Sequence, residues 1–323
     1  MKLIPWPAKT RESDPYHDKL DAIWQQLEQL KSALQSVVLP EHTGEPFDIG
    51  HLRFPERRAQ NVRQIRARAQ AVYLGDDTVL CRALGRYKMY LSASDVGFAA
   101  HLMLEGFWEF GITEFIARHV KPGMTVLDLG ANFGYYTLLM AELVGHNGRL
   151  MAFEPNPFAA KLLGRSIDIN GMSRIAALDT RAIWNESGQS LTFCVPVNEP
   201  KNARVVGAGK ESAGISDITV TTLALDDLPL QNVDFIKIDI EGAEQRMWSG
   251  MQEFLGRSPD VLVLLEFACG RCVDPRKTLE EMQQMFPLRY LGDDSVVRPI
   301  TVDQVLARPD DWMLVLSRRA LAF

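Results

Sequence analysis

From Lys121 onward the chain alternates between short apolar runs and amphipathic stretches, and this alternation restricts the fold more than any other feature. Near-continuous apolar runs are typical of parallel strands that are covered on both faces, and the intervening stretches have helical periodicity. The predicted strands are Val126–Leu129, Leu150–Phe153, Ile175–Leu178, Phe235–Ile238 and Val261–Glu266. The predicted helices cover residues 134–144, 158–169, 244–255 and 276–285. We therefore predict an α/β domain with a doubly wound, mostly parallel sheet.

Additional elements surround this repeating pattern. Between the third and fourth strands, an insert over 179–232 contains the predicted hairpin strands Leu191–Val195 and Ile218–Thr222. Near the end of the chain, Trp312–Leu316 is predicted to add an edge strand. Upstream we predict helices over 55–69 and Gly97–His119, with two short strands, Ala71–Leu74 and Val79–Leu84, between them. The expected domains are an N-terminal helix and linker over 1–54, a helical and β-rich preface over 55–120, and a catalytic domain over 121–323.

The N-terminal segment carries a heptad pattern. Leu20, Ile23, Leu27, Leu30, Leu34 and Val37 follow one another at spacings of 3, 4, 3, 4 and 3 residues. Such spacing indicates either the seam of a coiled coil, which would make the chain a homo-oligomer, or an amphipathic helix that packs on its own domain. Both readings stay open.

Composition excludes several classes of function. The 323 residues carry a net charge of -6, which disfavours nucleic acid as a partner because such binding draws on a basic surface. No apolar run reaches the roughly 20 residues that span a bilayer. Four cysteines are few for a chain of this length and suggest a reduced, cytoplasmic compartment. Cys269 and Cys272 form a C-x-x-C pair, but two ligands do not complete a zinc site.

A glycine-rich turn follows the first predicted strand. Asp128 ends that strand, Gly130 makes the turn, and Gly134 opens a helix, so that backbone N–H groups can approach a ligand. Asp128 stands where the dinucleotide fingerprint has its first glycine. An acid at that place repels a pyrophosphate and suits a ligand that carries an ammonium group. The turn therefore favours S-adenosylmethionine over NAD.

Glu154 follows the second predicted strand, 24 residues after Gly130. An acid at this place can bind both hydroxyls of a ribose, which NAD and S-adenosylmethionine share. The alternative is that Glu154 caps the next helix.

Three motifs in this order resemble the FkbM family of methyltransferases. They are Asp128–Thr137 (DLGANFGYYT), Phe153–Pro157 (FEPNP) and Phe235–Glu244 (FIKIDIEGAE), and Trp108-Glu109 and Thr222–Asp226 fit as well. The resemblance covers roughly residues 90–290. It implies a class I methyltransferase fold and methyl transfer from S-adenosylmethionine, usually to a hydroxyl of a sugar or a secondary metabolite.

The resemblance also implies roles for individual residues. Cofactor contacts carry over to Asp128, Gly130, Ala131, Asn132, Gly134, Glu154 and Ala182. In this set Glu154 is the ribose ligand and Ala182 flanks the adenine. Glu109 would reach the methionine end of the cofactor. Asp128 has a second reading, in which it supports the turn without touching the ligand.

The predicted fourth strand supplies the groups that could do chemistry. Lys237 and Asp239 share one face of it because side chains alternate along a strand. Glu266 ends the fifth strand, which is expected beside the fourth. A hydroxyl needs a base to take up its proton, so we predict Asp239 as base or orienting group, with Lys237 and Glu266 as partners. There are two alternatives: a purely structural ion pair, or a metal ion held by Asp239 and Glu266. We do not predict a metal site here.

The expected function is therefore O-methylation of a small-molecule or glycan acceptor. Three other readings remain beside it. An N-methyltransferase of the same fold would have the same cofactor motifs. A catalytically silent scaffold would keep the fold without turnover. An NAD-dependent dehydrogenase is disfavoured by Asp128.

Overall fold

An eight-stranded sheet forms the centre of the described chain. The structure is a computed structural model that describes residues 25, 47–196, 204–205, 215–308 and 311–321. The sheet has the order β14-β13-β15-β12-β11-β4-β5-β6. Its strands are β4 (Thr125–Leu129), β5 (Arg149–Phe153), β6 (Ala176–Asp179), β11 (Phe235–Ile238), β12 (Leu262–Ala268), β13 (Arg289–Leu291), β14 (Val297–Pro299) and β15 (Asp311–Leu316). The strands β6, β5, β4, β11 and β12 run parallel, as the alternating pattern predicts.

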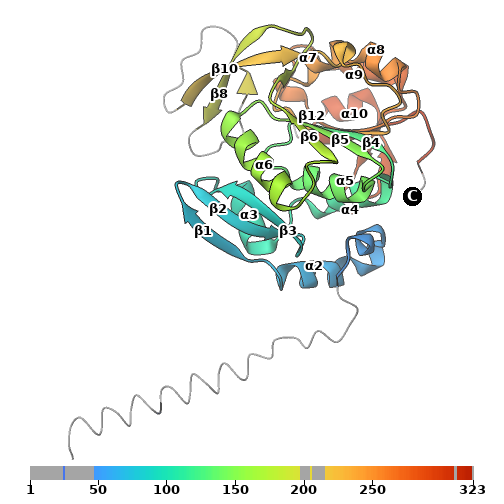
Figure 1. The fold of residues 1–323 in the computed structure, drawn as a ribbon. Helices are drawn as coiled ribbons and strands as arrows, with labels where there is room; N and C mark the ends of the chain where they lie inside the picture. Colours follow the sequence, from blue (N-terminus) through green and yellow to red (C-terminus); the bar gives the residue numbers. More distant parts are fainter. Residues whose placement is uncertain (1–24, 26–46, 197–203, 206–214, 309–310, 322–323) are drawn as a thin grey trace, which may run out of the picture. The chain divides into compact units, whose positions relative to one another are not determined.

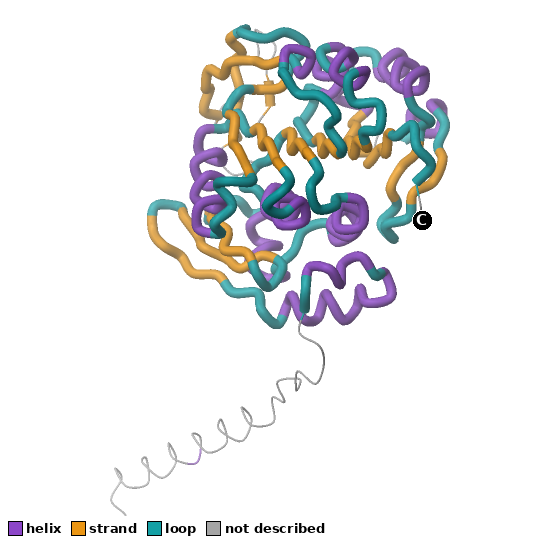
Figure 2. The backbone as a smooth tube through the Cα atoms, turned by 45° about the vertical axis from the view of Figure 1, so that its right-hand side comes forward, coloured by secondary structure: helices purple, strands orange, loops and turns teal. Residues whose placement is uncertain are grey.

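Helices cover both faces of this sheet (Figures 1 and 2). The described helices are α2 (Arg58–Arg66), α3 (Phe98–Glu105), α4 (Phe110–His119), α5 (Tyr135–Val144), α6 (Pro157–Ile169), α7 (Glu244–Ser249), α8 (Gln252–Gly256), α9 (Pro275–Met285) and α10 (Val302–Leu306). Of these, α2 and α3 lie beside the small sheet formed within residues 71–92 instead (Figure 1). Short 3₁₀ turns cover Ile49–Arg53, Pro55–Arg57, Leu225–Asp227 and Cys269–Arg271. Alternate residues of each central strand enter different cores, with Val126 in one and Leu127 in the other. This double burial explains why the strands are apolar throughout. The order and the antiparallel β15 match a class I methyltransferase fold.

Local sequence accounts for several helix boundaries. The Asn156 side chain accepts a hydrogen bond from the Phe158 backbone N–H at 3.0 Å, and Pro157 takes the first helical position of α6. Asp274 and Pro275 begin α9 in the same way. An N-cap oxygen followed by proline satisfies a free N–H group and presets the helical backbone.

Two smaller sheets accompany the central one. The first consists of β1 (Ala71–Gly75), β2 (Thr78–Ala83) and β3 (Tyr87–Ser92), so the preface contains a third strand that the sequence analysis did not include. The second has the order β7-β10-β8-β9, with β7 (Ala182–Ile183), β8 (Ser190–Pro196), β9 (Arg204–Val205) and β10 (Ile215–Leu223). The antiparallel pairing of β8 with β10 confirms the predicted hairpin.

The structure corrects three expectations. The stretch predicted as one helix over Gly97–His119 is two helices, because Gly106 ends α3 in the left-handed conformation, with a φ of 74°. The stretch over 244–255 likewise breaks into α7 and α8. The predicted edge strand at Trp312–Leu316 lies inside the sheet, where β15 pairs with both β12 and β13. Strands β13 and β14, which the sequence analysis missed, lie beyond it and form the edge.

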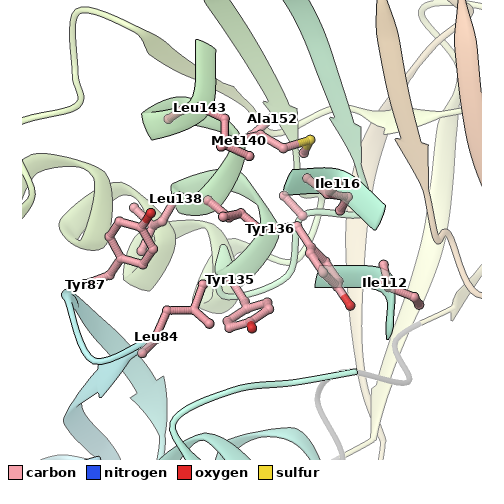
Figure 3. Close-up of a cluster of buried hydrophobic side chains, with 14 of the residues drawn as sticks. Leu84, Tyr87, Ile112, Ile116, Tyr135, Tyr136, Leu138, Met140, Leu143 and Ala152 are labelled. Carbon is pink, nitrogen blue, oxygen red and sulfur yellow. The ribbon is translucent and has the colours of Figure 1, made fainter. Parts of the chain in front are cut away.

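A buried cluster joins α4 and α5 to the turn between β2 and β3. Figure 3 shows Tyr135, Tyr136 and Leu138 of α5 in the cluster that also holds Ile112, Ile116 and Tyr87. The described elements from Phe47 onward belong to one compact unit, Phe47–Phe323. The heptad residues Leu20–Val37 lie outside the described residues, so homo-oligomer formation through them stays a prediction. Within the described part, no helix is long and apolar enough to cross a membrane.

Candidate active site

A cavity of about 410 Å³ opens at the carboxyl ends of the parallel strands. Doubly wound sheets bind their ligands at this edge. Four segments shape it: the turn after β4, the end of β5, the loop after β11 and the end of β12. Of the predicted site residues, those that line the cavity are Glu109, Gly130, Ala131, Asn132, Glu154, Ala182, Lys237, Asp239 and Glu266. The fold therefore brings most of the predicted set together.

The turn after β4 has a backbone that side chains other than glycine rarely adopt. Gly130 has a φ of 77° and Asn132 a φ of 52°. A Cβ atom added at Gly130 would lie 1.8 Å from the backbone oxygen of Asp239. Glycine is therefore required here for two reasons, its conformation and the close approach of the chain after β11.

Asp128 and Gly134 do not line the cavity. Asp128 is 1% exposed, and its Oδ2 accepts a hydrogen bond from the Thr137 hydroxyl at 2.6 Å. It lies directly opposite Lys237 in the ladder between β4 and β11. Burial raises the pKa of Asp128, and the charge of Lys237 opposes that rise. This geometry favours the reading in which Asp128 supports the turn and the sheet rather than contacting a ligand.

Glu154 lies at the cavity wall where β5 ends. Its Oε2 accepts from the Asn132 backbone N–H at 2.7 Å and its Oε1 from the Asn156 backbone N–H at 2.8 Å. Burial raises its pKa to about 7, although both hydrogen bonds favour the charged form. The alternative reading of Glu154 as the cap of α6 is wrong, because the N-cap of that helix is Asn156. The Glu154 carboxylate instead links the glycine turn to the end of β5 through its hydrogen bond from Asn132.

Lys237, Asp239 and Glu266 form a connected trio. The Lys237 ammonium is almost fully buried, at 3% exposure, and its Nζ lies 3.0 Å from Asp239 Oδ2. Asp239 and Glu266 are joined by a side-chain hydrogen bond. They belong to the neighbouring ends of β11 and β12, in agreement with the strand order predicted from the sequence.

The trio shares its charges unequally. Burial raises the pKa of Asp239, but attraction to Lys237 and the hydrogen bonds from Glu266 and Lys237 outweigh it, so the net shift is downward. Burial and the neighbouring Asp239 charge raise the pKa of Glu266. These opposite shifts favour a carboxylate on Asp239, beside the Lys237 ammonium, and a proton on Glu266. Among the described residues, no three His, Cys, Asp or Glu side chains are grouped so that they could hold a metal ion.

Tyr136 is a cavity residue that the sequence analysis did not assign. Its hydroxyl donates to Glu109 Oε2 at 2.8 Å, and Lys237 Nζ lies 5.0 Å from the centre of its ring. Burial raises the pKa of Glu109, which is also close enough to feel the charges of Asp239 and Lys237. The motif DLGANFGYYT contains Tyr136, but no local pattern marks which of its residues face the cavity.

Arg271 is the second residue that sequence reasoning missed. It lines the cavity from the 3₁₀ turn after β12, where it forms ion pairs with Glu241 and, at 3.0 Å, with Asp311. Glu241 follows β11 and Asp311 begins β15, so the contact depends on three distant segments. Cys269 and Cys272 flank Arg271 as free thiols.

Charge around the cavity is predominantly negative. Six acidic side chains, of which Glu266 favours its protonated form, and three cationic side chains line it. They are Glu109, Glu154, Asp239, Glu241, Glu266 and Asp311, against Arg181, Lys237 and Arg271. Each of the three cations is already in an ion pair with a carboxylate. Such a lining suits a ligand with positive charge and opposes one with phosphates.

Comparison with known proteins matches part of the chain to methyltransferases. A profile of the methyltransferase FkbM domain matches residues 128–283. The methyltransferase sdnD of Sordaria araneosa is 28% identical over 157 residues, which cover 40% of this chain and 60% of that protein. A protein-L-isoaspartate O-methyltransferase of Caenorhabditis elegans is 25% identical over 133 residues, 39% of this chain and 56% of that protein. The chain thus spans less than two thirds of the length of either relative.

Solved structures also resemble the chain. A methyltransferase FkbM from Methylobacillus flagellatus KT has a TM-score of 0.37 at 15% identity, covering 64% of this chain and 53% of that one. An S-adenosylmethionine-dependent O-methyltransferase from Thermotoga maritima has a TM-score of 0.39 at 13% identity, covering 79% and 87%.

The matched segment contains the glycine turn, Glu154, and the trio of Lys237, Asp239 and Glu266. All of these except Asp128 and Gly134 line the one cavity described above. Residues 128–283, which contain most of this site, thus match the methyltransferase FkbM domain that the sequence motifs resemble.

Proposed function

We propose that this chain is an O-methyltransferase that methylates a hydroxyl of an uncharged small molecule or glycan. The observation that carries the proposal is the trio of Lys237, Asp239 and Glu266, which opens on the same cavity as the glycine turn and Glu154. The candidate cofactor residues and a carboxylate able to receive a proton thereby line one cavity at one sheet edge.

The polar groups at the cofactor end of the cavity suit S-adenosylmethionine. A carboxylate at Glu154 can accept from both ribose hydroxyls, and Ala182 leaves room for a flat ring at the end of the cavity. Glu109 supplies a carboxylate for the ammonium group of the methionine end. When bound, the cofactor supplies an electrophilic methyl group on a sulfonium. The predominantly negative lining suits this net positive ligand.

The acceptor end has one ionised carboxylate in a proton-sharing pair. Because Glu266 holds a proton and donates it to Asp239, only Asp239 is left to orient a hydroxyl and to accept its proton at Oδ. Lys237 keeps Asp239 ionised when no acceptor is present. A base that forms a hydrogen bond to the attacking oxygen lowers the barrier by removing the proton as the new bond forms.

Asp239→Asn tests this assignment. We expect turnover to fall at least about a hundredfold, as is typical when a general base is lost, while the affinity for S-adenosylhomocysteine changes little. The assay follows transfer of a labelled methyl group to a panel of sugars, nucleotide sugars and polyketides. A protein that binds S-adenosylhomocysteine but methylates no member of the panel would contradict the proposal and support a silent scaffold. Complete loss of transfer in chelator, restored by a divalent ion, would reassign Asp239 and Glu266 to a metal.

The charge of the cavity bears on the choice of acceptor. Some relatives are protein-L-isoaspartate O-methyltransferases, so an isoaspartyl carboxylate is the natural competing acceptor. Here no cationic side chain of the lining lacks a carboxylate partner, and an anionic acceptor would meet uncompensated negative charge. We expect no transfer to an isoaspartyl peptide under conditions that methylate a neutral hydroxyl. Mass spectrometry of the product then separates oxygen from nitrogen as the methylated atom.

A further inference from the structure

Two adjacent tyrosines begin α5 directly after the glycine turn, and both reach the segment that carries Glu109. Tyr135 is 2% exposed and Tyr136 is 6% exposed. The Tyr135 hydroxyl lies 3.0 Å from Thr113 Oγ1, which itself donates to the Trp108 carbonyl at 2.9 Å. The Tyr136 hydroxyl donates to the Glu109 carboxylate at 2.8 Å. Figure 3 shows both rings inside the cluster between α4 and α5.

The backbone of Glu109 needs such support. Glu109 precedes α4 with φ 36° and ψ 71°, in the left-handed region. A side chain other than glycine adopts this conformation at an energetic cost, so its surroundings must hold it there. The conformation places a carboxylate in the cavity wall. Its hydrogen bonds come from the Tyr136 hydroxyl and the Trp108 side chain.

Tyr136 makes a second contact, through its ring, with the positively charged Lys237. The Lys237 ammonium lies 5.0 Å from the centre of its ring, within the range of a cation–π interaction. Lys237 forms an ion pair with Asp239, and the charge of Asp128, its neighbour in the ladder between β4 and β11, also acts on it. The tyrosine therefore contacts an anion through its hydroxyl and a cation through its ring, and it adds no charge of its own to the cavity.

We propose that Tyr136 is a positioning residue that orients the Glu109 carboxyl group toward the ammonium group of the bound cofactor. This inference rests on the cofactor role proposed for Glu109. The start of α5 would then contribute to cofactor binding in two ways. The glycines before the helix form the cofactor loop, and Tyr136, the second residue of the helix, orients the Glu109 carboxyl group in the same cavity.

Tyr136→Phe is the matched substitution, because it removes the hydroxyl and keeps the ring that contacts Lys237. We expect S-adenosylhomocysteine to bind at least about tenfold more weakly at neutral pH, since a hydrogen bond to a charged group is lost. Tyr135→Phe is the control: it removes a neighbouring buried hydroxyl that is hydrogen-bonded to the Thr113 hydroxyl and not to the Glu109 carboxylate. Its affinity should stay within about twofold of wild type.

The pH dependence of binding separates positioning from general damage. The hydrogen bond from Tyr136 favours the charged form of Glu109 and opposes the rise that burial causes in its pKa. Without that bond the pKa of Glu109 rises further, so the pH at which binding weakens on acidification should move upward in Tyr136→Phe. The groups that face Glu109 are Tyr135, Tyr136, Trp108, Lys237, Asp239 and Glu266. We expect Glu154 to titrate in the same way in wild type and in Tyr136→Phe. The measured quantity is therefore the difference between their pH midpoints of binding.

A double-mutant cycle with Glu109→Gln completes the test. In the Glu109→Gln background, Tyr136→Phe should change the affinity by less than about twofold and should not displace the pH midpoint. Equal losses in both backgrounds, or a loss that is the same at every pH, would overturn the inference. Failure of the wild-type chain to bind S-adenosylhomocysteine at all would instead refute the proposed function.

Discussion

Lys237→Met tests whether the buried ammonium stabilises the sheet as well as the site. The substitution preserves an unbranched apolar stem and removes the charge that Asp239 and Asp128 both feel. Breaking a buried ion pair from one side costs about 3–5 kcal/mol, because the remaining charge is buried without its partner. Asp239 opens on the cavity, with 30% of its side chain exposed, so we expect the lower end, about 3 kcal/mol.

The loss should depend on pH with a definite sign. In the wild type the pKa of Asp239 is lowered, so its contribution to stability is present above its unfolded pKa and disappears as pH falls through the folded value. In Lys237→Met the attraction and the hydrogen bond of Lys237 are lost, so burial raises the pKa of Asp239 above its wild-type value, opposed by the hydrogen bond from Glu266 and the charge of Arg271. The free energy of unfolding of Lys237→Met is therefore lowered at neutral pH, and it approaches the wild-type value as the carboxylates take up protons. The gap in stability should be full above about pH 6 and should narrow toward about pH 4.

Urea unfolding followed by tryptophan fluorescence, at several pH values, measures this gap. Lys161→Met is the control, since Lys161 is an exposed lysine on α6. Its stability should stay within about 0.5 kcal/mol of wild type. A Lys237→Met protein within about 1 kcal/mol of wild type at neutral pH, or a larger gap that does not change with pH, would refute this account of the buried pair.

Three further outcomes are expected. Glu154→Ala should weaken S-adenosylhomocysteine binding by about 1.5–3 kcal/mol in calorimetry, and wild-type binding should weaken as pH falls below about 7, because protonated Glu154 no longer accepts from both hydroxyls. Gly130→Ala should lower the melting temperature far more than Gly171→Ala, since both have a positive φ but only the first would bring a Cβ atom onto a backbone oxygen. Deletion of residues 1–40, or Leu27→Glu, should convert a dimer to a monomer in light scattering if the heptad is a seam; a full-length chain that is already monomeric at micromolar concentration would reject that reading.

The sequence predicted the parallel core because its physical signal is local. Strands covered on both faces must be apolar at successive positions, so Val126–Leu129 and Phe235–Ile238 are visible without any knowledge of their partners. The carboxyl ends of parallel strands share one edge. Placing Asp239 and Glu266 on consecutive strands was therefore enough to predict that they meet. The FkbM motifs added the identity of the cofactor.

Only the tertiary structure placed β15 inside the sheet. A short apolar run does not distinguish an edge strand from an interior one. Leu314, Val315 and Leu316 are buried in the cores on the two faces of the sheet, and β15 is interior because β13 and β14 lie beyond it.

Tertiary contacts also decided which polar groups share the cavity. Arg271 forms ion pairs with Glu241 and Asp311, and the three residues come from segments that are far apart in sequence. Tyr136 of α5 donates a hydrogen bond to Glu109, which directly precedes α4. Asp128 was predicted from its motif, but whether it contacts a ligand depended on the direction of its side chain, which faces Thr137 and the sheet. The sequence thus determined which residues end each strand, because strand ends follow from local patterns. Pairings between distant side chains depend on how the chain packs, and no local pattern records them.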